Sequence, residues 1–305
     1  MRADRILFPT DFSAASAQAL GAALFTAELL DAELVLQHVL VFREADLHIP
    51  EAHFPQPEEL FEKLHELATS ELGKLVEERH ERPLRLREVV DRSVDAARRI
   101  LERADEDDVD LIVLGTHGRR GAAHLLLGSV AAEVLRQARC PVLTMRSGSG
   151  SRPLRKLGHL VAAHDFSSAS DRALTHAAAL ARAVDARLDL VHVLEAPEVP
   201  MAPTPLVGGW ATAFFEDLEP KLSAKLAEVR ARDLAGIPGE NLVLRGRGAL
   251  ALVEHLEPLD VDLVVQGSQG RTGLDRILLG SFAERLARLA PCAVLTVPAR
   301  GRGLL

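Results

Sequence analysis

The sequence has few cysteines, no long apolar run and no long basic run. Its 36 Lys and Arg residues are outnumbered by 44 Asp and Glu, which gives a formal net charge of −8. This balance disfavours a dedicated nucleic-acid-binding protein. No stretch approaches the roughly 18 apolar residues of a membrane-spanning helix, and the first residues lead into a strand pattern rather than a signal peptide. We therefore expect a cytoplasmic protein without nucleic-acid or membrane partners.

The two cysteines, Cys140 and Cys292, occupy matching places in the two halves of the chain. Equivalent positions of a repeat lie far apart when each sits inside its own domain. We therefore expect two buried free thiols rather than a disulfide. The histidines show no paired ligand spacing on one element, so we predict no zinc site.

Four segments of the first half recur in the second half in the same order: 6–13 at 160–167, 37–40 at 191–194, 109–115 at 261–267 and 126–129 at 278–281. The repeat distance is 154 residues at Asp11 and Asp165 and 152 residues at Gly115 and Gly267, so the length change falls between these motifs. A duplicated domain explains all four matches. We place domain 1 at 1–147, a flexible Ser/Gly-rich linker at 148–156 and domain 2 at 157–299.

Apolar runs predict five strands in each half: near 6–9, 33–40, 84–90, 111–114 and 142–145, and near 160–163, 187–194, 241–244, 263–265 and 294–297. Helical spacing predicts long helices at 15–30, 57–80, 169–184 and 210–234. Strands that are continuous in Val, Leu and Ile and alternate with helices predict an α/β fold. We expect two tandem five-stranded parallel-sheet domains, Rossmann-like, with helices on both faces.

Helix starts carry capping signals. Ser13 is expected to cap the first helix, and in the second half Ser168 followed by Asp171 fits a capping box.

A glycine pattern follows the fourth strand of each half. In the first half Gly115, Gly118 and the pair Gly128-Ser129 are separated by two and then nine residues, and Gly267, Gly270 and Gly280-Ser281 repeat this spacing. Glycine after a buried strand lets backbone approach a ligand, and the start of a helix favours an anionic group. Arg119 and Arg271 add charge from the same loop.

Each of these features also has a purely structural interpretation. The Gly-Ser pairs would simply begin helices, and Asp11 and Asp165 would initiate helices through the dipole. Recurrence in both halves favours ligand contact. His38 and His192 lie on apolar strands and are expected to be hydrogen-bonded core residues. His117 lies in the loop, but Gln269 replaces it in the second half, which argues against a required proton transfer.

The glycine spacing, preceded by an Asp-Leu-Ile-Val strand and followed by Cys-Pro-Val-Leu, resembles the ATP-binding universal stress protein family over nearly the whole chain, twice. The resemblance implies an adenine nucleotide α-hydrolase-like fold that binds ATP, with Mg²⁺ held through the phosphates. It implies that an aspartate and a backbone group hold adenine and ribose, and that the glycine loop and Gly-Ser hold ribose and phosphates. By position the predicted binding residues are Pro9, Thr10, Asp11, Val39, Gly115, His117, Gly118, Arg119, Gly128, Ser129 and Val130, then Ala163, Asp165, Val193, Gly267, Gln269, Gly270, Arg271, Gly280, Ser281 and Phe282.

Each half departs from the family pattern. Thr10 before the first aspartate is replaced by His164 before the second, so we expect that turn to differ. Glycine after the third strand is present as Gly246, whereas the first half has Arg92-Ser93. Phe282 replaces Val130 beside the expected phosphates.

The chain has no Walker lysine, no nucleophile elbow and no paired carboxylates in the glycine loops. We therefore expect a nucleotide-responsive regulatory protein with no catalytic residue and at most slow ATP hydrolysis, acting on an unknown protein partner. The alternatives are a scaffold that binds no nucleotide and an adenylating enzyme with a similar sheet. The resemblance implies pairing of the last strands, 142–145 with 294–297, as an intrachain pseudo-dimer that leaves a homodimer possible.

Overall fold

The computed structural model describes residues 3–41, 57–77, 84–116, 127–148, 150–195, 206–270 and 279–304. Apolar runs form the strands β1 (Arg5–Pro9), β2 (Glu33–Val41), β3 (Leu86–Ser93), β4 (Leu111–Gly115), β5 (Val142–Met145), β6 (His159–Ala163), β7 (Arg187–Leu194), β8 (Asn241–Arg245), β9 (Leu263–Gly267) and β10 (Ala293–Val297). The helices are α1 (Ala14–Leu30), α2 (Pro57–Glu77), α3 (Ala96–Glu106), α4 (Ser129–Gln137), α5 (Ser168–Val184), α6 (Leu206–Asp233), α7 (Ala249–Leu256) and α8 (Ser281–Leu289).

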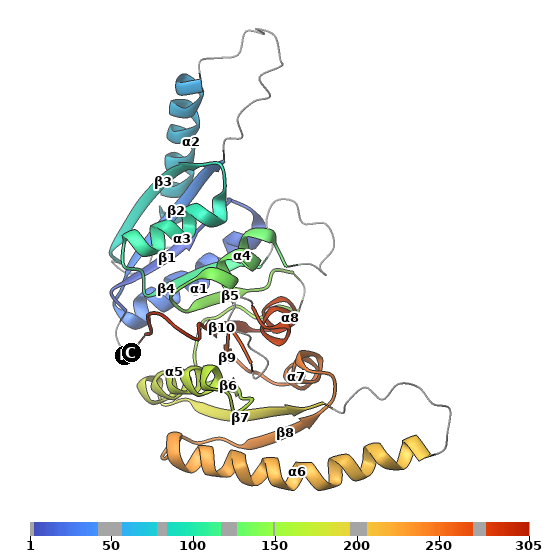
Figure 1. Ribbon diagram of the computed structural model, residues 1–305. Helices are drawn as coiled ribbons and strands as arrows, with labels where there is room; N and C mark the ends of the chain where they lie inside the picture. Colours follow the sequence, from blue (N-terminus) through green and yellow to red (C-terminus); the bar gives the residue numbers. More distant parts are fainter. Residues whose placement is uncertain are drawn as a thin grey trace.

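All described strands join one sheet in the order β3-β2-β1-β4-β5-β10-β9-β6-β7-β8 (Figure 1). The strands within each half are parallel, and the halves meet where β10 pairs antiparallel with β5. Leu295 lies opposite Leu143 at this junction. This is the intrachain pairing that the family resemblance implied, and it turns two five-stranded sheets into one continuous sheet.

Successive residues of each strand point to opposite faces, so the sheet has two apolar sides. In β1, Ile6 and Phe8 pack with α1 and α2, whereas Leu7 packs with α3 and α4. The first of these sides is one cluster of buried residues that continues under α5 and α6 of the second half. On the other side α3 with α4, and α7 with α8, cover separate clusters. The predicted fold class is confirmed.

The helix caps agree with the prediction in the first half and differ from it in the second half. Ser13 accepts a hydrogen bond from the Ser16 amide, as expected. In the second half the cap is Ser167, paired with Ser170, and not Ser168 with Asp171. The Asp165 side chain accepts from the Ser167 amide and holds Ser167 in an extended conformation, so the helix begins one residue earlier than predicted. The carboxylate of Asp171 accepts from His164 Nε2 instead.

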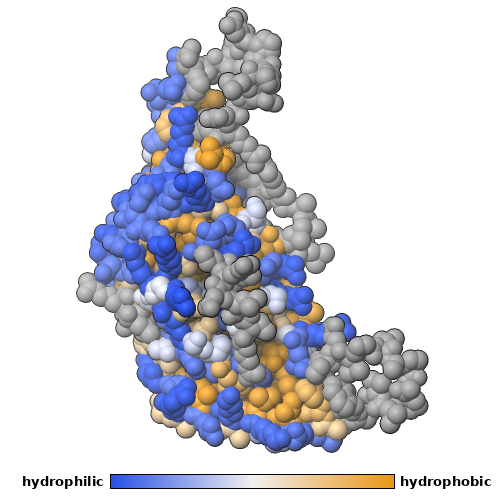
Figure 2. Space-filling model, viewed as in Figure 1, coloured by the Kyte–Doolittle hydropathy of each residue, from blue (hydrophilic) through white to orange (hydrophobic). Residues whose placement is uncertain are grey.

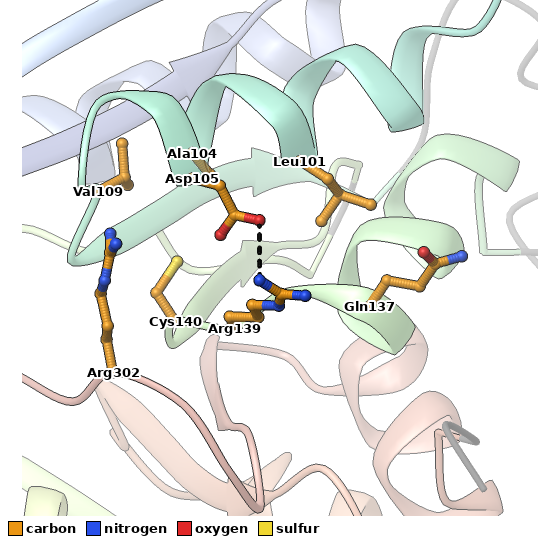
Figure 3. A pocket seen from close by; sticks show the side chains of 8 residues that line it. All are labelled: Leu101, Ala104, Asp105, Val109, Gln137, Arg139, Cys140 and Arg302. Atoms are coloured by element: carbon orange, nitrogen blue, oxygen red, sulfur yellow. Dashed lines mark ion pairs between the residues drawn. The ribbon is translucent and has the colours of Figure 1, made fainter.

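Both cysteines are buried free thiols, as predicted. Cys140 faces a small cavity between α3, the turn before β5 and the segment that follows β10; Asp105 and Arg139 form an ion pair across it (Figure 3). Burial raises the pKa of Cys140 to about 12, and that of Cys292 likewise. Both thiols therefore stay protonated and unreactive at neutral pH.

The segment 298–304, which we call the strap, crosses from the first half to α5 of the second (Figure 1). Gly301 has φ 116°, and a Cβ there would lie 2.1 Å from the Arg139 carbonyl oxygen, so only glycine fits. The Arg302 amide donates to that same oxygen. Arg172 donates to the carbonyls of Gly301 and Arg302. The strap thus ties the two halves together at a second place besides the sheet.

His176 fixes the end of the strap and makes its attachment sensitive to pH. His176 Nδ1–H donates to the Arg172 carbonyl, which leaves Nε2 to accept from the Leu304 amide at 3.2 Å. Burial lowers the pKa of His176, and Leu304 is itself buried. Because the unfolded chain takes up this proton near pH 6.5, the contribution to stability is complete above that pH and declines as pH falls below it.

We therefore expect hydrogen exchange at the Leu304 amide to accelerate as pH drops below about 6.5, after correction for intrinsic exchange. The variant His176→Gln, which cannot be protonated, serves as the control and should lose this dependence. An unchanged pH profile in the variant would assign the effect to another group.

None of the helices in the described part of the chain is long and apolar enough to cross a bilayer. On the face shown in Figure 2, hydrophilic residues dominate over α2 and α3, and apolar residues gather lower down, between α7 and α6.

Candidate functional site

A cleft of about 730 Å³, open to solvent, lies at the carboxyl ends of β6, β7 and β9 in the second half. This is where open α/β sheets hold ligands. Its walls bring together eight residues predicted from the sequence: Ala163, Asp165, Val193, Gly267, Gln269, Gly270, Gly280 and Phe282. Ser281 stands beside them as the first residue of α8.

Asp165 has the structural role considered for it, and it also lines the cleft. Its Oδ1 accepts from the amide and the hydroxyl of Ser167, which fixes the start of α5. Its Oδ2 lies 2.7 Å from the point where a Cβ on Gly270 would stand, so this oxygen faces the glycine turn across the cleft. In the first half Asp11 Oδ1 accepts from the Ser13 amide in the same way. In the second half, the carboxylate that fixes the start of α5 is therefore also part of the cleft wall.

The first glycine of each motif is required by packing. A Cβ on Gly267 would lie 2.9 Å from the backbone of Ala169, in the first turn of α5. A Cβ on Gly115 would lie 2.9 Å from the Ala15 carbonyl oxygen in α1. Glycine therefore lets the end of the strand touch the helix that follows the aspartate.

The helices that follow the glycine loops begin without a side-chain cap. Gly280 and Gly128 occupy the cap positions of α8 and α4, and no side chain of the described residues accepts from the first-turn amides there. The Gly280 amide donates to Ser268 O and the Gly128 amide donates to Thr116 O, which holds both turns in the same form. Ser129 and Ser281 are exposed at these openings. Free amides at a helix start are a binding site for anions.

The strand histidines are hydrogen-bonded core residues, as predicted. His38 Nδ1 lies 2.7 Å from the Thr10 carbonyl oxygen, and His192 Nδ1 lies 2.7 Å from the His164 carbonyl oxygen. Both rings are buried and pack against a phenylalanine that follows the aspartate. They fix the turn after the first strand of each half.

The turn before Asp165 was expected to differ from that before Asp11, and this expectation is wrong. The Phe12 amide donates to Thr10 Oγ1, and the Phe166 amide donates to His164 Nδ1, so the two side chains are equivalent acceptors. Phe12 and Phe166 share a left-handed conformation, with φ of 60° and 64°. Burial lowers the pKa of His164, which keeps its ring neutral and Nδ1 able to accept.

In the first half the described predicted residues occupy the corresponding positions. Pro9 ends β1, and Thr10 and Asp11 follow it. Val39 lies in β2 and Gly115 ends β4. Gly128, Ser129 and Val130 begin α4. His117, Gly118, Arg119 and Arg271 lie outside the described residues.

Sequence reasoning missed several residues of the cleft wall in the second half, among them Glu195, Gly248 and Gln266. Glu195 follows β7, and one of its carboxylate oxygens lies 2.9 Å from where a Cβ on Gly248 would stand, at the start of α7. Gln266 lies at the base of the cleft. The sequence does give one indication of Gln266. It is a polar residue in an otherwise apolar strand, and a polar side chain buried at such a position often has a specific structural or functional role.

Comparison with known proteins places both halves in one family model, that of the universal stress protein family, which matches residues 2–146 and 156–298. A universal stress protein of Methanocaldococcus jannaschii is 35% identical over 134 residues, which cover 44% of this chain and 77% of the relative. The Mycobacterium tuberculosis universal stress protein Rv2623 is 32% identical over 188 residues, covering 62% of this chain and 61% of that protein. The match thus spans about three-fifths of this mycobacterial relative.

The fold is also shared with a solved structure of full length. A universal stress protein from Archaeoglobus fulgidus superposes with a TM-score of 0.65 at 21% identity, covering 97% of this chain and 98% of that one. The tandem arrangement is therefore found in another protein with a different sequence.

Proposed function

Because this chain belongs to the universal stress protein family through both of its halves, we propose that it is a nucleotide-responsive regulatory protein that binds ATP in two clefts, one in each half. The observation that carries the proposal is the pair of uncapped helix starts, at Gly128 and Gly280, that follow the glycine loops. Amides in this arrangement favour phosphate groups.

The cleft in the second half offers contacts suited to each part of the nucleotide. Phosphates fit at Gly280 and Ser281, where amides and a hydroxyl donate. Ribose fits near Asp165, whose carboxylate is an acceptor on the cleft wall, and the base fits over Val193 at the end of β7. Mg²⁺ would be bound through the phosphates. In the first half Gly128, Ser129, Asp11 and Val39 take the same roles.

Binding without rapid turnover is the function we favour. His38 and His192 are engaged with backbone carbonyls in the core and are not positioned as general bases. His164, which also lines the second cleft, is engaged with the Asp171 carboxylate and the Phe166 amide. A protein of this kind acts by changing its contacts with a partner protein when nucleotide binds. The cell compartment we propose is the cytoplasm.

Nucleotide stoichiometry tests the proposal. Calorimetric titration with Mg-ATP should show two ATP molecules bound per unmodified chain. The variants Gly128→Glu and Gly280→Glu should each bind one ATP per chain, because a carboxylate at the helix start repels phosphate. The fold tolerates the second change, since a Cβ on Gly280 would be no closer than 3.5 Å to its neighbours.

Gly21→Glu is the matched control, because Gly21 is exposed in α1 with nothing within 4 Å of its Cβ position. It should keep both equivalents. An unmodified chain that binds no ATP would overturn the proposal and favour a scaffold. Rapid single-turnover consumption of ATP would favour an enzyme.

A further inference from the structure

Gln266, the residue before Gly267 in β9, has a buried acceptor atom that the fold leaves unused. Its side-chain Nε2 donates to the Ala283 carbonyl oxygen at 3.0 Å and to Thr296 Oγ1 at 3.1 Å. Its Oε1 has no hydrogen-bond partner among the described residues, although Gln266 is only 1% exposed. A buried polar atom without a partner is unfavourable, so its retention needs an explanation.

The orientation of this amide is fixed. Rotating it by half a turn would bring Oε1 against the Ala283 carbonyl oxygen, which only accepts hydrogen bonds. Nε2 therefore points toward α8 and β10, and Oε1 is the atom left for the cleft that Gln266 lines.

The two halves place this acceptor differently. Leu114 stands at the position of Gln266 in the first half, and it is buried. The first half has a glutamine on another strand, Gln37 in β2, whose counterpart in the second half is Val191 on the cleft wall. Gln37 Nε2 donates to Asp91, and its Oε1 also has no partner among the described residues. Each half thus has one buried glutamine acceptor at this level of the sheet, on β2 in one half and on β9 in the other.

We propose, building on the function proposed above, that Gln266 Oε1 accepts a hydrogen bond from a ribose hydroxyl of the nucleotide in the second cleft. Gln266 lies beneath the start of α8, where the phosphates bind, and a carbonyl oxygen repels phosphate oxygens. The sugar hydroxyls are the donors nearest to the phosphates. The base amine is farther away, over β7. Gln266 is therefore a specificity-determining residue that makes the second cleft select ribonucleotides.

The test uses Gly128→Glu, in which only the second cleft can bind. Affinities for ATP, 2′-deoxy-ATP and 3′-deoxy-ATP are measured by calorimetry. One of the deoxy analogues should bind roughly 3- to 10-fold more weakly than ATP, the usual effect of one hydrogen bond. Adding Gln266→Leu should weaken ATP binding by a similar factor. It should also abolish the difference in affinity between ATP and that analogue. Leucine is what the chain itself carries at position 114, so the fold should accept it.

The same substitution in the Gly280→Glu background, where only the first cleft binds, should change neither affinity nor discrimination. Discrimination that persists after Gln266→Leu would overturn the proposal. The proposal would also be overturned if Gln266→Leu lowered the melting temperature but left the ratio of the affinities for ATP and the deoxy analogue unchanged. That result is expected of a glutamine with a purely structural role. If Gly128→Glu binds no nucleotide at all, the proposed function of the second cleft fails first, and this inference fails with it.

Discussion

Replacing Asp189 with alanine is expected to lower the free energy of unfolding by about 1–3 kcal/mol, the usual effect of leaving a buried hydrogen-bond donor without its acceptor. The Asp189 carboxylate is 4% exposed and accepts from Arg187 Nε at 2.9 Å, His159 Nε2 at 2.7 Å and the Glu240 amide at 2.7 Å. Its loss leaves His159 Nε2 and the Glu240 amide without this acceptor between β6, β7 and β8, whereas Arg187 keeps its ion pair with the Glu240 carboxylate. Urea unfolding followed by circular dichroism measures the change.

The control is Asp217→Ala, which removes an exposed pair with Lys221 in α6 and should shift stability by less than about 1 kcal/mol. Burial by itself raises the pKa of Asp189, but hydrogen bonds from Arg187, Glu240 and His159 outweigh it and hold the pKa below 3.8. Stability from this group is therefore present above about pH 4 and is lost as pH falls through the folded-state pKa. Equal losses in the two variants would show that the network is not stabilising.

Gly267→Ala is expected to destabilise the protein by about 1–3 kcal/mol, as overpacking usually does, and to weaken ATP binding in the second cleft. The added Cβ would lie 2.9 Å from backbone atoms of Ala169, which are less able to move than a flexible side chain. Strand β9 and helix α5 must separate, and this displaces Asp165 from the glycine turn. Thermal unfolding and ATP titration of the same sample measure both effects.

Gly21→Ala is the matched control for this substitution, because α1 has open space at that position. It should stabilise the protein by up to about 1 kcal/mol through better helix propensity. If Gly267→Ala proved as harmless, the close contact between strand and helix would not be what retains glycine there.

The strands and their alternation with helices could be predicted because these features are periodic and local. Recurrence of the glycine spacing also predicted the walls of the cleft in the second half, from Asp165 to Gly280. The position of the α5 cap could not be predicted, because Ser167 and Ser168 are both suitable and the choice depends on the side-chain contact from Asp165. The strap was not predicted either, since its contacts join residues more than 100 positions apart, such as Arg172 and Gly301.

The candidate site, too, could be predicted only in part, because some of its contacts join residues that are distant in the sequence. The glycines of the motif have a recognisable spacing, but nothing in a single strand indicates that Gln266 is held by α8 and β10 together. The alternation of Gln37 and Gln266 between strands becomes visible only when both halves are superimposed on one sheet. The spacing of the motif glycines predicted which residues lie together in the cleft. Packing in three dimensions determines which of their atoms can contact a ligand.

One apolar cluster runs beneath α1, α2, α5 and α6 without a break between the halves. The duplicated chain is therefore a single cooperative unit rather than two independent modules on a tether. A substitution that disturbs the core of one half is therefore expected to destabilise the other half as well. Core residues of the two halves cannot change independently of each other. Divergence is safest at the rims, where the two copies differ at Val130 and Phe282.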